Sequence, residues 1–506
     1  MFDSLNSIFS FITPVSDWLW DFPTNYSWWS SIPVLGGFSF AVLLLMGAGI
    51  YFTVKTGFIQ VTHFKKAVKT VTTRSSAKTG ISPASSFLLS TAMRVGPGNI
   101  IGVTGAISTG GPGALFWMWL SAFFGMATAY VESVLAQIFK EKRGDEYVGG
   151  LPFYGRRLLK NSAIVGAFLS VLYILYALCC FPAQGFNTVS AVGQMAGIIT
   201  GQTIATNSAF YWIVAVLTIA LTAYVAFGGI KKVSGLTDIL VPIMAVVYCV
   251  IVLLLVILNV SRIPYFFGAV FGHAFTSEAV FGGVFGTILS QGIKRGLMSN
   301  EAGQGTMTMA AAASDAKHPS EQGCVQALGV FLDTIVICTL TGFVVVMGHV
   351  WTTDAADAWF AMDRLPRFLA SVSELAPGAL SGVSTFIVCL CFCLFAYTCL
   401  LGFVSFSEMC ARRISDNKGF ITFIRLLCLF VAAFGIVCNI AGFNLDNLWA
   451  FSDLGNIIIV YFNVPLLFIG AKYAFAATKQ YRADENARFT SETIGFKGEL
   501  FWDNKD

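Results

Sequence analysis

Charged residues are scarce in this chain of 506 residues, because Asp, Glu, Lys and Arg make up 11% of it and hydrophobic residues make up 56%. The mean hydropathy is +0.74. A water-soluble domain carries about 25% charged residues, so most of this chain must be dissolved in lipid. The chain also lacks the alternating segments of about ten residues that build a transmembrane β-barrel. The sequence therefore predicts an all-α polytopic membrane protein.

The residue patterns of most catalytic and metal sites are also missing. The four histidines lie in loops or at the ends of apolar stretches, and no metal-ligand spacing, nucleophile triad or phosphate-binding motif is present. The twelve cysteines all fall in or at the ends of apolar segments, which predicts free thiols, most of them packing residues. We expect a protein that is not an enzyme, has no cofactor and no nucleic-acid partner, and is surrounded by membrane lipid.

Basic residues are missing from the first 32 positions, which argues against a cleaved signal peptide with a basic start. The tryptophans Trp18, Trp20, Trp28 and Trp29 are typical of a segment that lies at the membrane interface. We therefore expect residues 1–32 to form a periplasmic, interfacial N-terminal segment.

Eleven apolar stretches are long enough to cross a membrane as helices, which need about 20 residues each. They form a predicted transmembrane domain over residues 33–475, and the polar residues 476–506 predict a cytoplasmic tail without a domain of its own. The predicted spans are 33–53, 84–108, 114–139, 164–195, 208–228, 237–260, 279–296, 323–350, 380–408, 420–440 and 446–475.

The Lys and Arg residues lie in alternate connections between these spans. One set of connections holds only Arg262, Arg364 and Arg367. Cytoplasmic loops are enriched in Lys and Arg, so the asymmetry predicts a bacterial inner-membrane protein with its N-terminus outside and its C-terminus in the cytoplasm. The basic connections hold Lys55, Lys65, Lys66, Lys69, Arg74, Lys78, Lys140, Lys142, Arg143, Arg156, Arg157, Lys160, Lys231, Lys232, Lys294, Arg295, Lys317, Arg412, Arg413, Lys418 and Arg425.

The ten spans after the first divide into two sets of five, 84–260 and 279–475, which run through the membrane in opposite directions. The leading span of each set contains glycines that interrupt a helix. Broken spans at corresponding positions of two halves indicate an inverted-repeat transporter with its binding site at the breaks. The glycines are Gly96 and Gly98 in the first half, and Gly282, Gly283, Gly286, Gly292 and Gly296 in the second.

The first break has the sequence Val95-Gly96-Pro97-Gly98-Asn99. A freed backbone group in lipid costs several kcal/mol unless it is satisfied, so a break at this depth indicates a cavity that binds a ligand. The N–H groups at the start of the resuming helix attract a carboxylate, and the carbonyl groups that end the first half suit an ammonium group or Na⁺. An α-amino acid fits both ends. The alternative is a kink made only for helix packing.

Further polar residues within the spans are candidates for the same site. Gln184 follows Pro182 and either meets the substrate or bonds to a neighbouring helix. Thr398 and Cys399 lie in a stretch of small residues. Hydroxyl and carbonyl oxygens there suit Na⁺, and the alternative is a contact that holds two helices together.

Three charged residues, Arg94, Glu132 and Asp333, lie within predicted spans. Ionisable side chains in a membrane are functional candidates by default, and the alternative for each is a structural ion pair. The stretch Ser299-Asn300-Glu301-Ala302-Gly303 follows the second glycine-containing span, where we expect it to shape the inner gate.

A resemblance to a known family rests on the stretch Gly110-Gly111-Pro112-Gly113-Ala114-Leu115-Phe116-Trp117-Met118-Trp119-Leu120-Ser121-Ala122-Phe123-Phe124-Gly125. It resembles the signature of the alanine/glycine:cation symporter family, the sodium:alanine symporters. The stretches 296–303 and 329–334 support the resemblance, which covers residues 33–475. It implies an amino-acid/polyamine-type fold, a five-plus-five inverted repeat of the leucine-transporter kind with an additional N-terminal helix.

The resemblance also implies a set of site residues. Two of them depart from the family pattern, because Cys399 stands where Thr is expected and Phe403 where Trp is expected. A thiol is a poor Na⁺ ligand, so Thr398 and carbonyl groups must supply the coordination. The implied substrate contacts are Gly96, Gly98, Asn99, Gln184, Cys399 and Phe403, and the implied sodium ligands come from Ala92, Val95, Thr398 and Cys399.

These observations predict a secondary transporter that couples inward flow of Na⁺ to uptake of a small neutral amino acid, alanine, glycine or serine, by alternating access. One alternative is a Na⁺- or H⁺-coupled transporter of a larger neutral amino acid such as glutamine. The other is an amino-acid sensor that binds without transporting, which the short polar tail disfavours because it leaves no room for a signalling domain.

Overall fold

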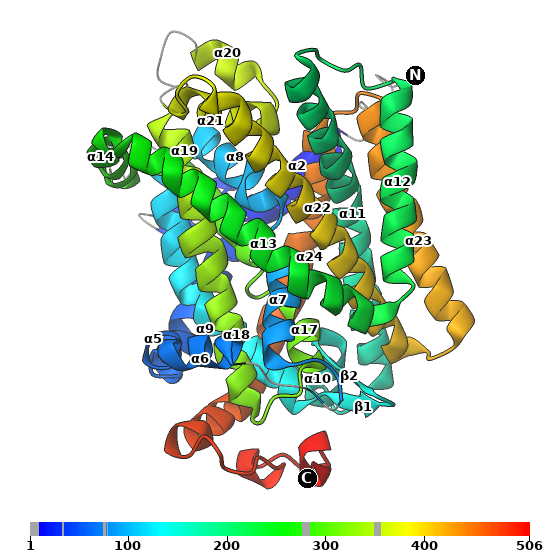
Figure 1. The fold of residues 1–506 in the computed structure, drawn as a ribbon. Helices are drawn as coiled ribbons and strands as arrows, with labels where there is room; N and C mark the ends of the chain where they lie inside the picture. Colours follow the sequence, from blue (N-terminus) through cyan, green and yellow to red (C-terminus); the bar gives the residue numbers. More distant parts are fainter. Residues whose placement is uncertain are drawn as a thin grey trace.

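The protein is a bundle of helices that run up and down between two opposite faces (Figure 1). The computed structural model describes residues 10–32, 35–73, 77, 79–275, 284–348 and 356–505. Helices α20 and α21 lie on one face, and the C-terminal end of the chain lies on the other (Figure 1). The second face also holds a two-stranded hairpin, β1 (Glu141–Arg143) and β2 (Glu146–Val148), whose strands pair antiparallel.

Eight helices in the described part of the chain are long and apolar enough to cross a membrane. A further apolar helix, α4, is shorter, and the first predicted span of the first half is interrupted between α7 and α8. Each predicted span matches a helix or a pair of helices, while the count of eleven stays a prediction. The bundle consists of α4 (Phe40–Lys55), α7 (Pro83–Arg94), α8 (Ile101–Gly110), α9 (Ala114–Ile138), α11 (Ala163–Thr200), α12 (Ala209–Ala226), α13 (Gly229–Leu258), α16 (Val284–Asn300), α17 (Met307–Ala313), α18 (Pro319–Val330), η4 (Phe331–Cys338), α19 (Thr339–Met347), α22 (Leu380–Ile414), α23 (Lys418–Ile440) and α24 (Leu445–Ala483).

Shorter elements lie around this bundle. They are α2 (Ile12–Asp21), α3 (Ser27–Ser30), η1 (Leu35–Gly37), α5 (Ile59–Thr62), α6 (Phe64–Thr72), η2 (Pro97–Asn99), α10 (Leu151–Leu158), η3 (Val260–Arg262), α14 (Ile263–Ala274), α20 (Ala356–Ala361), α21 (Arg364–Leu375), η6 (Glu492–Ile494) and η7 (Phe501–Asn504).

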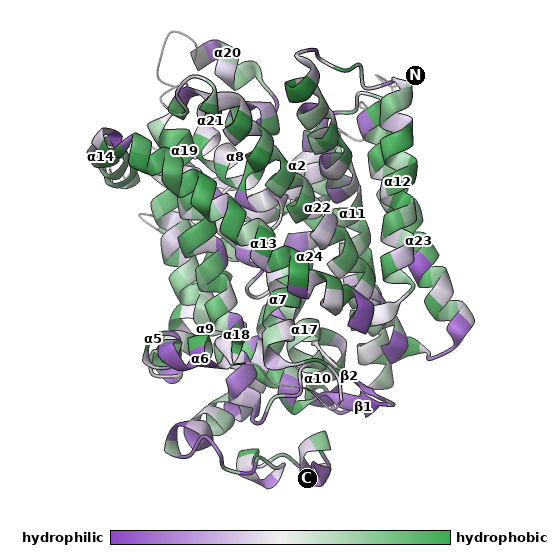
Figure 2. Ribbon diagram, viewed as in Figure 1, coloured by the Kyte–Doolittle hydropathy of each residue, from purple (hydrophilic) through white to green (hydrophobic). Residues whose placement is uncertain are grey.

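Hydrophobic residues predominate along the helices of the bundle, and hydrophilic residues gather at the end that carries the hairpin and the C-terminus (Figure 2). Exposed large side chains such as Val216, Leu217, Val250 and Phe430 lie on its helices. Water would penalise such a surface, whereas lipid chains would not. All twelve cysteines are free thiols, as predicted.

The second break lies later in the chain than the sequence predicts. Residues 284–300 form one uninterrupted helix, and the chain leaves helical geometry only at 301–306, where Glu301, Gly303 and Gly305 have φ values of 55°, 86° and 75°. The prediction that Gly292 and Gly296 interrupt this helix was wrong. A Cβ at either position would lie 2.5 Å from an atom of α9, so these glycines allow two helices to approach closely. Gly286 also lies inside α16, and Gly282 and Gly283 lie outside the described residues.

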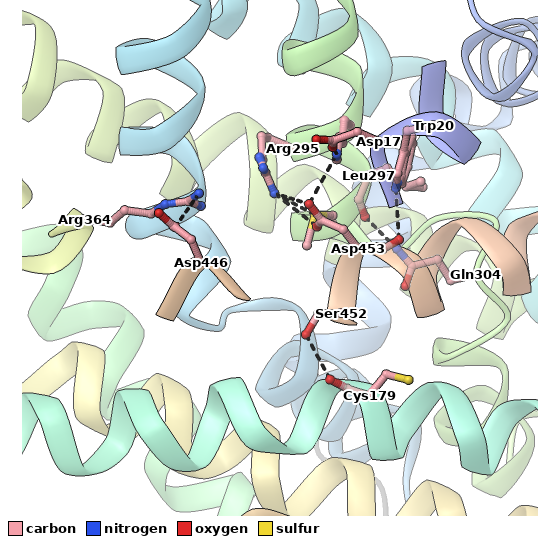
Figure 3. Close-up of polar contacts among 12 residues, drawn as sticks. Asp17, Trp20, Cys179, Arg295, Leu297, Gln304, Arg364, Asp446, Ser452 and Asp453 are labelled. Carbon is pink, nitrogen blue, oxygen red and sulfur yellow. Dashed lines mark hydrogen bonds and ion pairs between the residues drawn. The ribbon is translucent and has the colours of Figure 1, made fainter. Parts of the chain in front are cut away.

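Lys294 and Arg295 were assigned to a basic cytoplasmic connection, and this assignment was wrong. Both lie inside α16 and are buried, and both form ion pairs with Asp453 of α24, at 3.3 Å and 3.2 Å. Lys294 also contacts Asp17 of α2 at 3.2 Å. Figure 3 shows this cluster of charges, in which opposite charges compensate the cost of burial.

The N-terminal helix α2 packs against α24 through Ile12, Ser16 and Trp20, which are spaced four residues apart on one helix face. Trp20 is 1% exposed, and its indole N–H donates to the Asp453 carbonyl at 2.9 Å. Trp20 is therefore part of the protein interior, whereas Trp18 is exposed, as an interfacial tryptophan is.

Candidate functional site

The break between α7 and α8 is formed by residues 95–100, as predicted. Ser82 accepts a hydrogen bond from the N–H of Ser85 and begins α7, with Pro83 in its first turn. The helix ends at Arg94, and a short 3₁₀ turn over Pro97–Asn99 precedes α8. The carbonyl end of one helix and the N–H end of the next therefore lie at the same place. Their partial charges are opposite in sign.

Gly96 is required by a close approach of α22. A Cβ on Gly96 would lie 2.7 Å from Cys399 Sγ, closer than these atoms can pack. Gly98 differs, because the nearest atom to a Cβ there is the Met298 carbonyl oxygen at 3.8 Å. The backbone of the break therefore packs tightly against α22 at Gly96, whereas at Gly98 there is space for a side chain next to α16.

Asn99 holds the shape of the break. Its Oδ1 accepts a hydrogen bond from the Gly96 N–H at 2.8 Å, and its Nδ2 donates to Asp333 Oδ1 at 2.6 Å. Both side chains are completely buried. The structure brings Asn99 to the break, and its direct contact with a substrate stays a prediction.

The predicted sodium ligands converge where α7 ends. The Ala92 carbonyl accepts hydrogen bonds from the Thr398 hydroxyl at 3.3 Å and from the Cys399 thiol at 3.4 Å. The thiol also reaches the Met93 carbonyl at 3.2 Å. Val95 is fully buried and ends the helix. Carbonyl and hydroxyl oxygens at the negative end of a helix dipole fit Na⁺, so the donor set matches the ion apart from the sulfur atom of Cys399.

Gln184 and Phe403 lie on α11 and α22, which pack antiparallel. Three cross-contacts fix the alignment: the rings of Phe181 and Phe403 at 5.7 Å, Cys393 Sγ to the Thr188 carbonyl at 3.6 Å, and Cys389 Sγ to the Ala191 carbonyl at 3.3 Å. They place Gln184 near the level of Thr398. Gln184 is 9% exposed, and within the described part of the chain its Oε1 has no hydrogen-bond donor.

Phe403 is buried between the rings of Phe181 and Tyr176. It lies one helical turn beyond Cys399, so it can form a wall of a pocket at the break. Its contact with a substrate stays a prediction.

The second break, 301–306, is braced by buried polar side chains. Glu132 Oε2 accepts hydrogen bonds from the Gly305 N–H and from Asn463 Nδ2, both at 3.2 Å. Arg94, at the end of α7, donates from Nε to the Asn300 carbonyl at 3.0 Å. The end of each broken helix therefore contacts the other, and the two breaks form one polar region in the bundle.

Ser299, Thr334 and Cys338 surround Asp333; the sequence singled out Ser299 only as part of a gate-forming stretch, and it missed Thr334 and Cys338 as site residues. Ser299 Oγ and Thr334 Oγ1 each donate to Asp333 Oδ2 at 2.7 Å. Ser299 also contacts Cys338 Sγ at 3.1 Å. The sequence carries one signal of this cluster, the polar triplet Ser299-Asn300-Glu301 at the end of an apolar span. The residues that contact this triplet could not be identified from sequence, because Thr334 and Cys338 lie in an apolar run that shows no polar pattern.

Comparison with known proteins decides the family. The sequence model of the sodium:alanine symporter family matches residues 28–494. The chain belongs to the sodium:alanine symporter family. It is therefore a multi-pass membrane protein and a sodium-coupled amino-acid symporter, as predicted, and the relatives are transporters.

Two relatives and one solved structure illustrate the range of similarity within and beyond this symporter family. "Sodium/alanine symporter AgcS" of Methanococcus maripaludis is 34% identical over 82% of this chain and 88% of that protein. "Probable sodium/glutamine symporter GlnT" of Bacillus subtilis is 33% identical over 88% of each chain. The crystal structure of MhsT in complex with L-phenylalanine aligns with a TM-score of 0.55 at 13% identity, over 85% of this chain and 95% of that chain. This structural likeness shows that the symporter has the leucine-transporter fold.

Proposed function

We propose that this symporter uses the inward Na⁺ gradient to take up a small neutral amino acid, alanine, glycine or serine, by alternating access. The observation that carries the proposal is the meeting of Thr398 and Cys399 with the final carbonyls of α7, beside the N–H end of α8. A cation at the carbonyl end and a substrate carboxylate at the N–H end would each face the favourable end of a helix dipole.

Substrate contacts in this proposal come from both sides of the break. Gly96, Gly98 and Asn99 present the backbone and one amide, and Gln184 offers its unpartnered Oε1 to the substrate ammonium group. Cys399 and Phe403 line the side formed by α22. The Na⁺ takes the carbonyls of Ala92 and Val95 with Thr398, while the Cys399 sulfur contributes weakly.

Alternating access needs a barrier between this site and each face of the membrane. Asp453 lies eight residues into α24, about 12 Å along the helix, and Thr398 lies about 27 Å into α22. Both helices begin at the face that carries α21, where Arg364 pairs with Asp446 at 2.9 Å. The cluster of Lys294, Arg295 and Asp453 (Figure 3) therefore lies between the level of the site and this face, where it would form the barrier on this side.

The orientation in the membrane belongs to the same proposal. Helix α6, which carries Lys65, Lys66 and Lys69, and strand β1, which carries Lys142 and Arg143, lie with the C-terminus at the hydrophilic end of the bundle (Figures 1 and 2). By the positive-inside rule this end is cytoplasmic. In this orientation the Lys294–Arg295–Asp453 cluster forms the barrier between the site and the outer side of a bacterial inner membrane.

The division into segments also stays part of the proposal. The N-terminal segment 1–32 lies on the outer side, 33–475 forms the transporter with its repeats 84–260 and 279–475, and 476–506 is the cytoplasmic tail. The last helix continues to Ala483, and beyond it the Trp502 indole donates to the Gln137 carbonyl at 2.7 Å, so the tail packs back on the bundle.

The test is uptake of labelled amino acids into proteoliposomes with and without an inward Na⁺ gradient. One Na⁺ entering down 100 mV contributes about 2.3 kcal/mol, which allows about fortyfold accumulation. Alanine, glycine and serine should accumulate only with the gradient. Binding without accumulation would indicate a sensor and would refute the proposal.

Glutamine is the second candidate substrate, because one relative is named for it and because Phe in place of a larger Trp leaves more space at position 403. Competition by unlabelled glutamine against alanine uptake decides between the two. Potent inhibition by glutamine with accumulation of labelled glutamine would favour the larger substrate.

Asn99→Ala tests the break itself. It removes the amide that caps the turn and bonds Asp333, so uptake should fall at least about tenfold, as for loss of a buried hydrogen bond to a charged group. Asn259→Ala is the matched control, because the Asn259 side chain donates to the carbonyls of Leu255 and Leu375, away from the break. Equal uptake by the two variants would remove Asn99 from the site.

A further inference from the structure

We propose that the cavity between α6, the start of α18 and the C-terminal tail binds the phosphate headgroup of an anionic phospholipid. Such a site goes beyond the proposed function, because a lipid bound there is neither the substrate nor a coupling ion. The site is supported by the size and charge of the cavity, by two lysines on its wall that form no ion pair, and by the exposed apolar side chains beside α6.

The cavity has a volume of about 810 Å³, within the range of sites that bind small molecules. It lies at the hydrophilic end of the bundle, with α6 and the C-terminus (Figures 1 and 2). One part of its wall comes from α6, one from residues 315–321 and one from the tail after α24. Positive charge predominates on this wall. The cationic lining residues are Lys66, Lys69, Lys317, Arg488 and Lys505, and the acidic ones are Asp315, Glu321 and Glu485.

Three of the five cations already have an acidic partner. The partners are Glu485 for Lys66, Asp315 for Lys505 and Asp503 for Arg488. These contacts hold the tail in place, because each of them involves a residue of the tail. They leave two cations for a ligand.

The remaining cations, Lys69 and Lys317, differ from the other three. In the part of the chain that the structure describes, neither ammonium group takes part in a hydrogen bond or an ion pair. Glu321 accepts the backbone N–H of Lys317 at 2.8 Å and does not pair with its side chain. Two ammonium groups on the wall of one cavity attract an anion, and a phosphate oxygen is a strong acceptor for them.

Helix α6 lies where the chain passes between two helices of the bundle. It follows α4, which ends at Lys55, and precedes α7, which begins at Pro83. Exposed apolar side chains accompany the lysines in this connection; they are Phe58, Val61 and Val68. A basic amphipathic helix with exposed apolar side chains lies in the interface of a membrane. The cavity is therefore at the level of lipid headgroups, which favours a lipid phosphate over phosphate from solution.

A phosphodiester in the cavity would receive charge-assisted hydrogen bonds from Lys69 and Lys317. The hydroxyl of Thr70, next to Lys69 on α6, also lines the cavity and supplies a neutral donor. The headgroup would link α6 to the start of α18 and to the tail. Pro83, the first residue of α7, lines the same cavity, so the lipid would also contact the helix that ends at the first break.

The experiment is a titration of the purified full-length protein in detergent with phosphatidylglycerol, in which native mass spectrometry measures the affinity for the first bound lipid. Lys69→Gln with Lys317→Gln should weaken binding about thirtyfold, the change that about 1 kcal/mol for each lysine at a membrane surface gives. Zwitterionic phosphatidylcholine should bind the wild-type chain more weakly than phosphatidylglycerol. Inorganic phosphate should not displace the lipid.

Lys65→Gln with Lys418→Gln is the matched control. It removes the same charge from two exposed lysines that do not line the cavity, at α6 and at the start of α23, and it should bind like the wild-type chain. An equal loss in both double variants would mean diffuse attraction to the lipid and would overturn the inference. Equal wild-type affinity for the two lipids would overturn it too. Displacement by inorganic phosphate would identify a soluble anion as the ligand instead.

Hydrogen exchange of the tail provides a second readout. Phosphatidylglycerol should slow exchange over residues 484–505 in the wild-type chain and not in Lys69→Gln with Lys317→Gln, and equal slowing in both would count against the cavity. If this double variant does not fold, Lys317→Gln alone supplies the test, with an expected loss of affinity of about fivefold. Unchanged affinity in Lys317→Gln would refute the site.

Discussion

Replacing Asp453 by Asn should destabilise the state in which the Lys294–Arg295–Asp453 cluster is closed, the gate proposed above. In the structure the Asp453 carboxylate faces Arg295 Nη1 at 3.2 Å and Lys294 Nζ at 3.3 Å. The side chains of all three residues are between 6% and 9% exposed. Asn leaves Arg295 without this carboxylate, and Lys294 keeps its pair with Asp17 and the attraction of Asp21. When the gate opens, water reaches both cations, so the substitution penalises the closed state and not the open one.

The size of this effect follows from the distances. A pair of unit charges 3.2 Å apart attracts by about 5 kcal/mol at an effective dielectric constant near 20. Removing one partner of a buried pair costs about 3–5 kcal/mol. Since 1.4 kcal/mol corresponds to a factor of ten, the population of open molecules should rise by about a hundredfold or more.

Hydrogen exchange of the purified protein measures this shift, because amides exchange when the gate opens. Asp453→Asn should accelerate exchange in α2 and α16 and should slow Na⁺-driven uptake. The matched control is Asp446→Asn on the same face. The Asp446 side chain is 59% exposed in its pair with Arg364, so its loss should cost at most about 1 kcal/mol. Equal exchange in the two variants would refute the assignment of the cluster as a gate.

Two further predictions concern the proposed sodium site and His318. Cys399→Ser replaces a soft sulfur by a hard oxygen next to the Ala92 and Met93 carbonyls, so the Na⁺ concentration for half-maximal uptake should fall by about tenfold, or 1.4 kcal/mol. Cys389→Ser, on the same helix but bonded to Ala191, should leave it unchanged, and equal values for the two would contradict the site. At the start of α18, burial lowers the pKa of His318 from 6.5 to about 4, so the unfolded chain binds a proton first as the pH falls. Stability should be full above pH 6.5 and about 2 kcal/mol lower at pH 5. His318→Asn, which can still cap α18, should flatten that dependence in thermal unfolding, and an unchanged slope would exclude His318 as its source.

Part of the fold and the site can be predicted from sequence because the signals are local. An apolar run of about 20 residues crosses a membrane wherever it occurs, so each predicted span matches described helices. The break at 95–99 was also found, since glycine and proline near the middle of such a run interrupt the helix at a depth where lipid cannot satisfy the freed backbone groups. Thr398 and Cys399 were paired with Ala92 through a family resemblance, and the structure brings these residues together.

Other features depend on which residues meet across the bundle. Gly292 and Gly296 look like helix breakers in sequence, yet they pack against α9, and the true break follows at 301–306. The sequence around Lys294 and Arg295 predicts a basic cytoplasmic connection, whereas the structure shows both side chains in ion pairs with Asp453.

The sequence by itself determined the class of protein, the first break and the family, because hydropathy and short motifs are properties of neighbouring residues. Only the tertiary structure decided the partners of the buried charges. Asp333 and Asn99 are 234 residues apart, and neither segment of the sequence indicates that the other is its contact partner. A buried charge is tolerated only when donors or counter-charges surround it in space, and the fold alone supplies those neighbours.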